Sequence, residues 1–276
     1  MIQDIHPVHF NNHYDPLTPG ASDHIICFHD NKFYVHYCEK DQKLVFPKWS
    51  EFLGCEESVY LFSLGEDKFF LIMDAQTLPD GYEWYNTQPE LRRMKKQGNL
   101  DIFIIYTAWH LVKWYQSSRF CGACGEKTEF DKTERAMVCP KCGNKIYPRI
   151  NPAVIVGVTN GDRLLLTKYN RTYAYNALIA GFTEIGETME ETVQREVMEE
   201  AGLKVKNIRY YKSQPWGIAA DILMGFYCDV DGDDTIHRDN TELKYAAWVE
   251  RQDIELQPDS LSLTNEMMMM FKEGLI

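Results

Sequence analysis

Apolar residues recur with two different periods along the chain, and the pattern changes at a cluster of cysteines. Between residues 90 and 118, apolar side chains recur at spacings of three and four, which predicts a mostly helical segment. Its spaced positions are Ile102, Ile105, Trp109, Val112 and Tyr115. Before it, short apolar runs broken by turn residues predict strands at His24–Phe28, Phe33–His36, Val59–Leu64 and Lys68–Asp74. We expect an N-terminal α+β domain over residues 1–118 that ends in a connecting helix.

After the cysteines the pattern becomes mostly that of strands. Two apolar runs flank Asn160-Gly161, which predicts a two-residue hairpin. A helix is expected over Met189–Ala201 and a closing helix over Ser262–Lys272, where a run of four methionines is typical of core filling. The expected strands are Ala153–Thr159, Arg163–Lys168, Asn207–Ser213, Ile222–Val230 and Leu243–Val249. We divide this half into residues 119–147 and a domain over 148–276.

Composition and charge narrow the class of protein. The chain has 276 residues, of which 45% are apolar and 25% charged, as in ordinary globular proteins. We find no secretory signal and no apolar run of the roughly 18 residues that span a bilayer, so we expect a soluble, cytoplasmic protein. A net charge of −12 disfavours non-specific nucleic-acid binding, which depends on basic residues.

Four of the eight cysteines have the spacing of two zinc knuckles, Cys121-x2-Cys124-x14-Cys139-x2-Cys142. Four thiolates complete a tetrahedral site and leave no open position, so this pattern predicts one structural Zn²⁺ per chain. An iron–sulfur centre or redox pairs are alternatives. The remaining cysteines lack such spacing and are expected to be small buried side chains: Cys27, Cys38, Cys55 and Cys228.

The most specific pattern lies in residues 181–203, which read GFTEIGETMEETVQREVMEEAGL. They fit G-x5-E-x7-R-E-U-x-E-E-x-G-U, where U is a bulky aliphatic residue. Seven fixed residues match by chance on the order of once in 10⁸ windows, given average residue frequencies. These are Gly181, Glu187, Arg195, Glu196, Glu199, Glu200 and Gly202.

The spacing of the glutamates indicates a metal site. On a helix, Glu196, Glu199 and Glu200 share one face, and such hard oxygen ligands suit Mg²⁺ or Mn²⁺. A solvated acidic helix face is the alternative. We expect Arg195 to orient a carboxylate through a bidentate pair. Gly181 and Gly186 are expected to allow a tight turn before the helix and Gly202 to end it.

This pattern resembles the signature of the Nudix family of diphosphate hydrolases. The resemblance implies an α+β fold: an α/β/α sandwich around a mixed sheet, here preceded by a zinc ribbon and an N-terminal α+β domain. It also implies that metal is held by Glu196 and Glu200, that Glu199 is a further ligand or the catalytic base, and that the Ala180 carbonyl joins them.

A zinc ribbon directly before such a domain is similar to the NADH pyrophosphatase branch of that family. Tyr147-Pro148 and Ser213-Gln214-Pro215-Trp216 match that branch in position. The resemblance implies hydrolysis of NADH or NAD⁺ to nicotinamide mononucleotide and AMP by a homodimer. It implies Glu242 as another metal ligand. The substrate-binding residues it implies are Phe182, stacked on the nicotinamide, and Tyr147, Gln214, Pro215, Trp216, Asp221 and Arg92.

One segment departs from the branch and keeps alternatives open. Where the branch has Pro-Phe-Pro-x-Ser, this chain has Gly217-Ile-Ala-Ala-Asp221. The loss of two prolines and an aromatic residue favours a less preorganised loop. Another nucleoside diphosphate derivative, such as a nucleotide sugar, a dinucleoside polyphosphate or FAD, is therefore an alternative substrate. NAD-cap removal from RNA and a non-catalytic nucleotide sensor are further hypotheses.

Single residues of the implied substrate site also have simpler interpretations. Trp216, Phe182 and Tyr147 are each compatible with core packing. Glu242 is compatible with an ordinary solvated acid.

Overall fold

The computed structural model describes the chain except for residues 53–56, 74–76, 95–97 and 171–174. Cys55 and Asp74, the end of one expected strand, lie outside the described residues. The chain forms two compact units. One contains residues 3–149 and 217–220, and the other contains residues 1–2, 150–216 and 221–276. The division into three domains, with the ribbon separate, stays a prediction.

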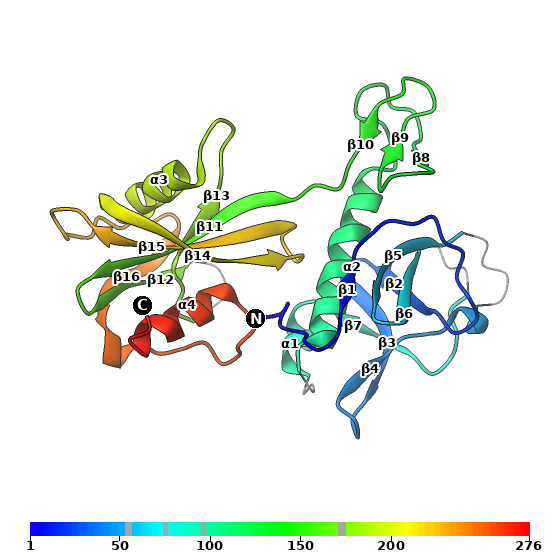
Figure 1. Cartoon of the computed structure of the whole chain (residues 1–276), viewed down its shortest axis with the longest axis horizontal. Helices are drawn as coiled ribbons and strands as arrows, with labels where there is room; N and C mark the ends of the chain where they lie inside the picture. Colours follow the sequence, from blue (N-terminus) through cyan, green and yellow to red (C-terminus); the bar gives the residue numbers. More distant parts are fainter. Residues whose placement is uncertain (53–56, 74–76, 95–97, 171–174) are drawn as a thin grey trace. The chain divides into compact units, whose positions relative to one another are not determined.

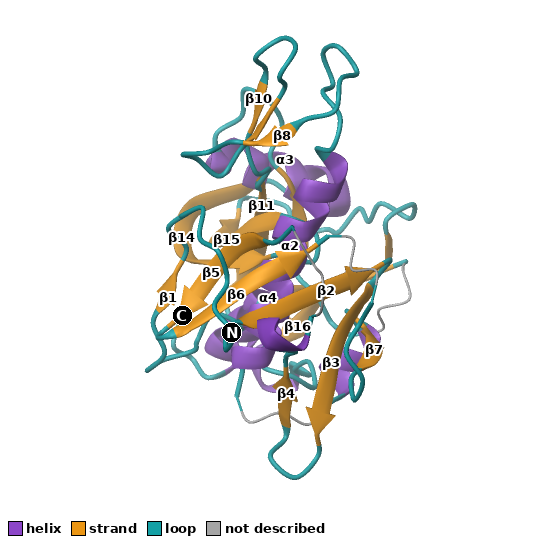
Figure 2. Ribbon diagram, turned by 90° about the vertical axis from the view of Figure 1, so that its right-hand side faces the viewer, coloured by secondary structure: helices purple, strands orange, loops and turns teal. Residues whose placement is uncertain are grey.

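The first unit is built on a seven-stranded sheet in the order β1-β5-β6-β2-β3-β4, with β7 paired to β3 (Figures 1 and 2). Among the described strands of this sheet, the β2–β6 pair is parallel and the other pairs are antiparallel. The strands are β1 (Phe10–Asn11), β2 (His24–His29), β3 (Lys32–Cys38), β4 (Lys43–Val45), β5 (Val59–Leu64), β6 (Asp67–Ile72) and β7 (Glu83–Asn86), with the short helix η1 (Trp49–Glu51) before β5. The four strands expected from the sequence are confirmed, whereas the short β1, β4 and β7 were missed.

The helical segment expected at residues 90–118 is confirmed as two helices, α1 (Pro89–Arg93) and α2 (Leu100–Ser117). The five spaced apolar positions of α2 are all buried. Trp109 packs against Phe28 of β2 with ring centroids 5.0 Å apart, and Phe103 packs against Phe10 at the same separation. Across the described parts of the chain, no helix has the length and apolarity needed to cross a membrane.

The cysteine segment forms a small antiparallel sheet in the order β10-β9-β8. Its two-residue strands are β8 (Glu129–Phe130), β9 (Met137–Val138) and β10 (Lys145–Ile146). Arg135, in the turn before β9, donates from Nη2 to the backbone carbonyl of Leu61 over 2.6 Å. Its guanidinium also lies 5.3 Å from the Tyr14 ring centroid. A half-buried cation therefore ties the ribbon to the N-terminal sheet of the same unit.

The second unit is a mixed sheet in the order β14-β15-β11-β12-β16, with β13 paired to β11. The central strand β11 is parallel to β15 and antiparallel to β12 and β13. Its elements are β11 (Asn151–Asn160), β12 (Arg163–Tyr169), β13 (Ile179–Phe182), α3 (Met189–Ala201), β14 (Val205–Trp216), β15 (Asp221–Val230), β16 (Leu243–Glu250), η2 (Arg251–Asp253) and α4 (Leu263–Lys272). The expected elements of this half are confirmed within a few residues, whereas β13 was missed.

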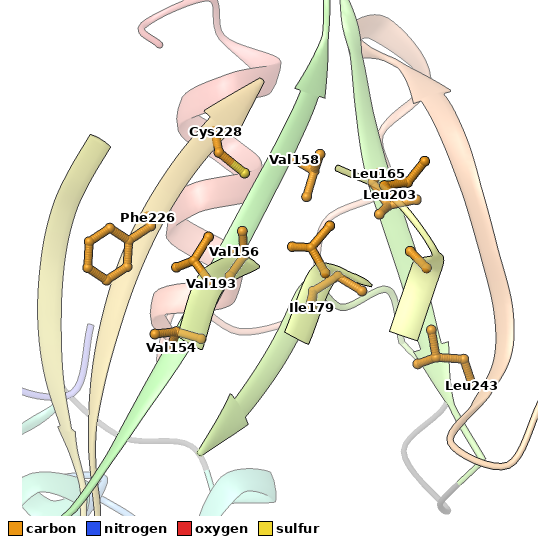
Figure 3. Packing of buried hydrophobic residues seen from close by; sticks show 12 residues of the cluster. Val154, Val156, Val158, Leu165, Ile179, Val193, Leu203, Phe226, Cys228 and Leu243 are labelled. Atoms are coloured by element: carbon orange, nitrogen blue, oxygen red, sulfur yellow. The ribbon is translucent and has the colours of Figure 1, made fainter. Parts of the chain in front are cut away.

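Successive side chains of a strand point to opposite faces of the sheet, and apolar side chains of β11 lie on both faces. A helix therefore covers each face. Val154, Val156 and Val158 of β11 pack with Val193 of α3 in one buried cluster (Figure 3). Ile155 alternates with these valines, so it points to the other face of the sheet and packs in a second buried cluster with the residues of α4. Figure 1 shows α3 and α4 on opposite sides of the sheet. The expected α/β/α sandwich is confirmed.

The hairpin between β11 and β12 shows how local sequence sets the register. Asn160 pairs with Arg163, so the two turn residues are Gly161 and Asp162, one position later than expected. Gly161 has φ of 61°, which a glycine adopts without steric cost. In α4, the expected methionine core is confirmed for Met267 and Met268, which are fully buried.

The packing of β12 gives the first testable prediction. Leu165 is fully buried, whereas Leu275 near the C-terminus is 60% exposed. Leu165→Ala leaves a cavity and should lower the free energy of unfolding by about 2–5 kcal/mol, whereas Leu275→Ala should change it by less than about 0.5 kcal/mol. Urea denaturation of both full-length variants measures the difference. Equal effects would contradict the packing described for this face.

Candidate active site and metal centre

The loop and helix of the 181–203 segment have well-defined ends. The Thr188 hydroxyl accepts from the Glu191 N–H over 3.2 Å, and the Glu191 carboxylate accepts from the Thr188 N–H over 2.8 Å. This capping box begins α3. The helix ends at Gly202, whose φ of 69° and ψ of 21° are left-handed, as expected for a C-cap. Both ends fix where the glutamates of α3 point.

The three glutamates of α3 differ sharply in exposure. Glu200 is 2% exposed and Glu196 8% exposed, whereas the Glu199 side chain is 59% exposed. Glu242, in the loop before β16, is exposed but close enough to raise the pKa of both buried acids. The structure thus brings Glu242 within electrostatic range of Glu196 and Glu200, and it places Glu199 at the solvent side of the helix.

Burial and mutual repulsion destabilise the charged forms of these acids. Burial, with the charges of Glu196 and Glu242, raises the pKa of Glu200 to about 8. Burial also raises the pKa of Glu196, against the opposing effect of Arg195. A cation between these carboxylates would remove the repulsion. Their environment therefore favours a bound cation over a solvated helix face.

Arg195 neutralises part of this charge by pairing with three carboxylates, and it also holds a main-chain carbonyl. Its Nε and Nη2 donate to the two oxygens of Glu187 over 2.6 and 2.9 Å, which is the expected bidentate pair. Nη1 donates to Glu196 over 2.7 Å and to Glu199 over 3.0 Å, and Nη2 also donates to the Phe182 carbonyl over 2.8 Å. The hydrogen bonds from Arg195 lower the pKa of Glu187 to about 2. Arg195 therefore orients Glu196 and Glu199 at once.

Gly181 is required for a different reason from the one expected. A Cβ at this position would overlap the carboxyl group of Glu196. Gly181 has no left-handed φ, whereas Gly186, in the loop, has φ of 95°. The tight-turn role is therefore right for Gly186 and wrong for Gly181. The absent side chain of Gly181 lets the Glu196 carboxylate lie against β13.

The Ala180 carbonyl, implied as a metal ligand, lies close to Glu200. The Tyr169 hydroxyl is 3.3 Å from each Glu200 oxygen and 3.4 Å from the Ala180 carbonyl oxygen. Two buried carboxylates and a main-chain carbonyl are a hard-oxygen donor set of the kind that holds Mg²⁺ or Mn²⁺. The residues present therefore fit a divalent cation. Tyr169 is a member of this group that the sequence patterns did not single out.

The implied substrate residues of this unit divide into exposed and buried ones. Phe182 is 52% exposed and Pro215 is exposed, while Trp216 is half-buried, so core packing is wrong for Phe182. Gln214 is fully buried: its amide donates to the Leu261 carbonyl over 2.8 Å and accepts from the Leu263 N–H over 2.7 Å. Those two bonds anchor the start of α4, so Gln214 supports the scaffold rather than facing solvent.

Asp221 is the most unusual residue of the departing segment. It is 6% exposed, and its Oδ1 has no hydrogen-bond partner among the described residues. Burial raises its pKa to about 6, while a hydrogen bond with Asn151 acts in the opposite direction. A buried acid with an unpaired oxygen can accept from a hydroxyl or amide donor of a ligand.

Tyr147 and Arg92 belong to the other unit. The Tyr147 side chain is 54% exposed, so core packing is wrong for it, and its hydroxyl donates to Glu134 over 2.6 Å. Arg92 is half-buried in α1. Gly217 lies against α2 within this unit, where a Cβ would overlap the Tyr106 carbonyl oxygen. Steric contact therefore explains the glycine that starts the departing segment.

The four ribbon cysteines form a metal-sized cluster. Their sulfur atoms all lie within 4.8 Å of one another. Three of the sulfur pairs are 3.5–3.6 Å apart: Cys124 to Cys139, Cys121 to Cys142, and Cys124 to Cys142. Tetrahedral Zn–S bonds of about 2.3 Å require sulfur separations of about 3.8 Å, so the cluster fits one Zn²⁺.

Two matching turns build this cluster. In each, the N–H of the glycine after the second cysteine donates to the carbonyl of the first: Gly125 to Cys121 over 2.8 Å and Gly143 to Cys139 over 2.9 Å. Both glycines have φ of 74°. Backbone N–H groups, that of Ala123 foremost, lower the pKa of Cys121 to about 6. The turns therefore favour the thiolate at the first cysteine of each pair, whereas hydrogen bonds with the neighbouring thiols raise the pKa of Cys124 and Cys142.

Comparisons with known families agree with both sites. Residues 149–268 match the model of the NUDIX domain, and residues 116–147 match that of the NADH pyrophosphatase zinc ribbon domain. Residues 149–268 are a Nudix domain. The resemblance drawn from the 181–203 segment and from the cysteine spacing is confirmed.

Two curated relatives of the chain are both named NAD-capped RNA hydrolase NudC. The chain is 42% identical over 149 residues to the NAD-capped RNA hydrolase NudC of Enterobacter sp. (strain 638), an alignment that covers 54% of this chain and 57% of the relative. It is 44% identical over 139 residues to that of Pectobacterium atrosepticum, covering 50% and 53%. The chain thus spans about half the length of the curated relatives it matches.

A solved structure supports the fold alone. The crystal structure of a NUDIX hydrolase from Nitrosomonas europaea is similar with a TM-score of 0.50 and 22% identity. The similarity covers 56% of this chain and 91% of that one.

Gly181 in the Nudix domain provides a prediction about the metal site. The atoms that a Gly181→Ala side chain would meet are the flexible end of Glu196, so the fold should persist while the carboxylate moves. Mn²⁺ affinity, measured by isothermal titration, should fall about 10-fold or more, as when other contacts that orient a metal ligand are lost. Gly20→Ala, at an exposed site with ordinary packing distances, is the control. Unchanged Mn²⁺ affinity in Gly181→Ala would show that Glu196 is not a ligand.

The cysteine cluster provides a second prediction. Cys121→Ser removes one ligand of a closed site and should reduce bound zinc from one ion per chain towards zero, with a lower melting temperature. Cys38→Ser, outside the cluster, should leave the zinc content unchanged. Atomic absorption on the purified proteins gives the count. Full zinc content in Cys121→Ser would rule out the four-thiolate site.

Proposed function

We propose that the chain hydrolyses the diphosphate bond of NADH or NAD⁺, giving nicotinamide mononucleotide and AMP, with Mg²⁺ or Mn²⁺ as cofactor. The observation that carries this proposal is the buried acidic group of the Nudix domain: Glu196 and Glu200 beside the Ala180 carbonyl. The NADH pyrophosphatase type of zinc ribbon and the relatives named NAD-capped RNA hydrolase support the choice of dinucleotide.

The roles of the acids follow from their burial. Glu196, Glu200 and the Ala180 carbonyl would hold the divalent cation, with Glu242 approaching from its loop. When bound, the cation supplies Lewis acidity and neutralises charge on the diphosphate oxygens. Glu199 is exposed and held by Arg195 at 3.0 Å, so it can accept a proton from the attacking water.

The base-binding part of the substrate site rests on two residues. Phe182 presents an exposed ring on the strand that leads into the catalytic loop, where it can stack on a nicotinamide or adenine ring. The Phe182 carbonyl accepts from Arg195, so the backbone that bears this ring is tied to the residue that orients the acids. Asp221 can accept a hydrogen bond from a ribose hydroxyl or an amide. We keep Pro215, Trp216, Tyr147 and Arg92 as proposed contacts and give Gln214 a supporting role.

The departing segment supports a second candidate function. Gly217–Ala220 lacks the aromatic and proline residues of the branch, and Asp221 adds an acid. These changes favour a different nucleoside diphosphate derivative, such as a nucleotide sugar, a dinucleoside polyphosphate or FAD. A nucleotide sensor without activity is disfavoured, because the acids are both intact and grouped.

Removal of NAD caps from RNA is a further part of the proposal. We propose NAD-cap removal as an additional activity, on the strength of the relatives' names. A net charge of −12 favours recognition of the cap over affinity for the RNA chain.

We propose a homodimer from the resemblance to the NADH pyrophosphatase branch. Light scattering at micromolar concentration would report twice the 32.2 kDa chain mass.

A substrate panel separates these functions. NADH, NAD⁺, NAD-capped RNA, FAD and a nucleotide sugar are incubated with zinc-loaded protein and Mg²⁺ or Mn²⁺, and the mononucleotide products are quantified. AMP and nicotinamide mononucleotide from NADH or NAD⁺ support the first function. Turnover of the other diphosphates alone supports the second. Nucleotide binding without any turnover would contradict both.

Glu200→Gln tests the role of the most buried acid. Gln matches a neutral Glu in shape, so the fold should persist, while kcat should fall at least about 10-fold, as it does even when contacts outside a metal's ligand set are lost. Glu190→Gln, exposed on the first turn of the same helix, should retain the activity of the unaltered protein. AMP release at saturating metal gives both rates. Full activity in Glu200→Gln would mean that Glu200 does not bind the metal.

A further inference from the structure

Tyr169 lies outside the 181–203 segment but reaches into its acidic group. It is the last residue of β12, where the register with β16 shifts: Lys168 pairs with Tyr245, and Tyr169 pairs with Leu243. The additional residue on β16 forms a bulge, and bulges of this kind re-aim the side chains beside them. The Tyr169 ring packs against the buried cluster under α3. Its direction is therefore fixed by both the backbone and the core.

The Tyr169 hydroxyl meets four oxygen atoms. It is 3.3 Å from Oε1 and from Oε2 of Glu200, 3.3 Å from the Leu178 carbonyl oxygen and 3.4 Å from the Ala180 carbonyl oxygen. A phenol has one proton to donate, so it satisfies one of these acceptors at a time. It is nevertheless within hydrogen-bonding reach of both the Glu200 carboxylate and the Ala180 carbonyl.

The next residue extends the same connection to Glu242. The Asn170 N–H donates to the Glu242 carbonyl over 2.8 Å. The Asn170 amide donates to the carbonyls of Asn240 and Thr241, each over 3.0 Å. The end of β12 thus holds the backbone of the loop that bears the fourth acid. One dipeptide, Tyr169-Asn170, links the acids of the helix to the acid outside it.

We propose that Tyr169 is a positioning residue that holds the Glu200 carboxylate and the Ala180 carbonyl at the separation needed to bind one divalent cation. It complements Arg195, which holds Glu187, Glu196 and Glu199. A cationic side chain in the place of Tyr169 would compete with the metal for Glu200, whereas a neutral phenol orients this carboxylate without adding positive charge. The proposal rests on the divalent-metal site of the proposed function, and it does not depend on which diphosphate is hydrolysed.

Tyr169→Phe tests this role because it removes the hydroxyl and keeps the ring in the core. Tyr227→Phe is the matched control: Tyr227 is also buried, and its hydroxyl donates to the Met267 carbonyl over 2.7 Å on the α4 face of the same sheet. Both variants lose one phenol hydroxyl and its hydrogen bonds. A general effect on packing should therefore appear in both.

The primary measurement is the Mn²⁺ dissociation constant of the full-length, zinc-loaded protein, followed by electron paramagnetic resonance in the absence of nucleotide. We expect Tyr169→Phe to bind Mn²⁺ about 10-fold more weakly, as is typical when a group that orients a metal ligand is lost. Tyr227→Phe should match the unaltered protein. Diphosphatase activity of Tyr169→Phe should recover as Mn²⁺ is raised.

The outcomes separate this proposal from the proposed function. Weakened Mn²⁺ binding in Tyr169→Phe alone supports the positioning role, even if NADH proves not to be a substrate. Equal Mn²⁺ affinity in all three proteins overturns the positioning role, even if NADH is hydrolysed. Equal weakening in both variants overturns it as well, because the effect would then be one of packing. Absence of Mn²⁺ binding by the unaltered protein overturns both the positioning role and the metal site.

Discussion

Repulsion between buried carboxylates is the constraint on which the active-site region depends. Glu196 and Glu200 lie on one face of α3, with Glu242 nearby, and burial makes each negative charge costly. The surrounding residues offset part of that cost. Arg195 pairs with the acids nearer the loop, and Tyr169 and the backbone of Ala180 contact Glu200. The remaining negative charge favours a divalent cation, which is also the group that diphosphate hydrolysis requires.

The zinc ribbon applies the same principle with sulfur. Four thiols within 4.8 Å of one another repel when ionised, and backbone N–H groups of the two knuckle turns stabilise the thiolates of Cys121 and Cys139. The two sites differ in their ligands. Four thiolates close the zinc site, whereas the acids of the Nudix domain include Glu199, whose side chain is exposed to solvent. The zinc site is therefore suited to stabilising the fold, and the acidic site to binding a catalytic metal.

Sequence patterns predicted the parts of this structure that local spacing determines. The bounds of α3, the burial of α2 and the grouping of the cysteines follow from residues a few positions apart. Tyr169 and the burial of Gln214 and Asp221 could not be predicted, because each depends on contacts between residues distant in sequence or on a bulge. The steric need for a glycine at position 181 could not be predicted either, since the Glu196 carboxylate contacts it only after α3 packs on β13.

The central claim is that the acidic group of the Nudix domain is completed by a divalent cation. Calorimetric melting of zinc-loaded, full-length protein during Mn²⁺ titration tests it most directly, since a ligand that binds only the folded state stabilises it by mass action. The account predicts that the melting temperature of the Nudix unit rises with Mn²⁺ and does not rise with choline chloride of equal ionic strength. A melting temperature that Mn²⁺ and choline chloride change equally would contradict it.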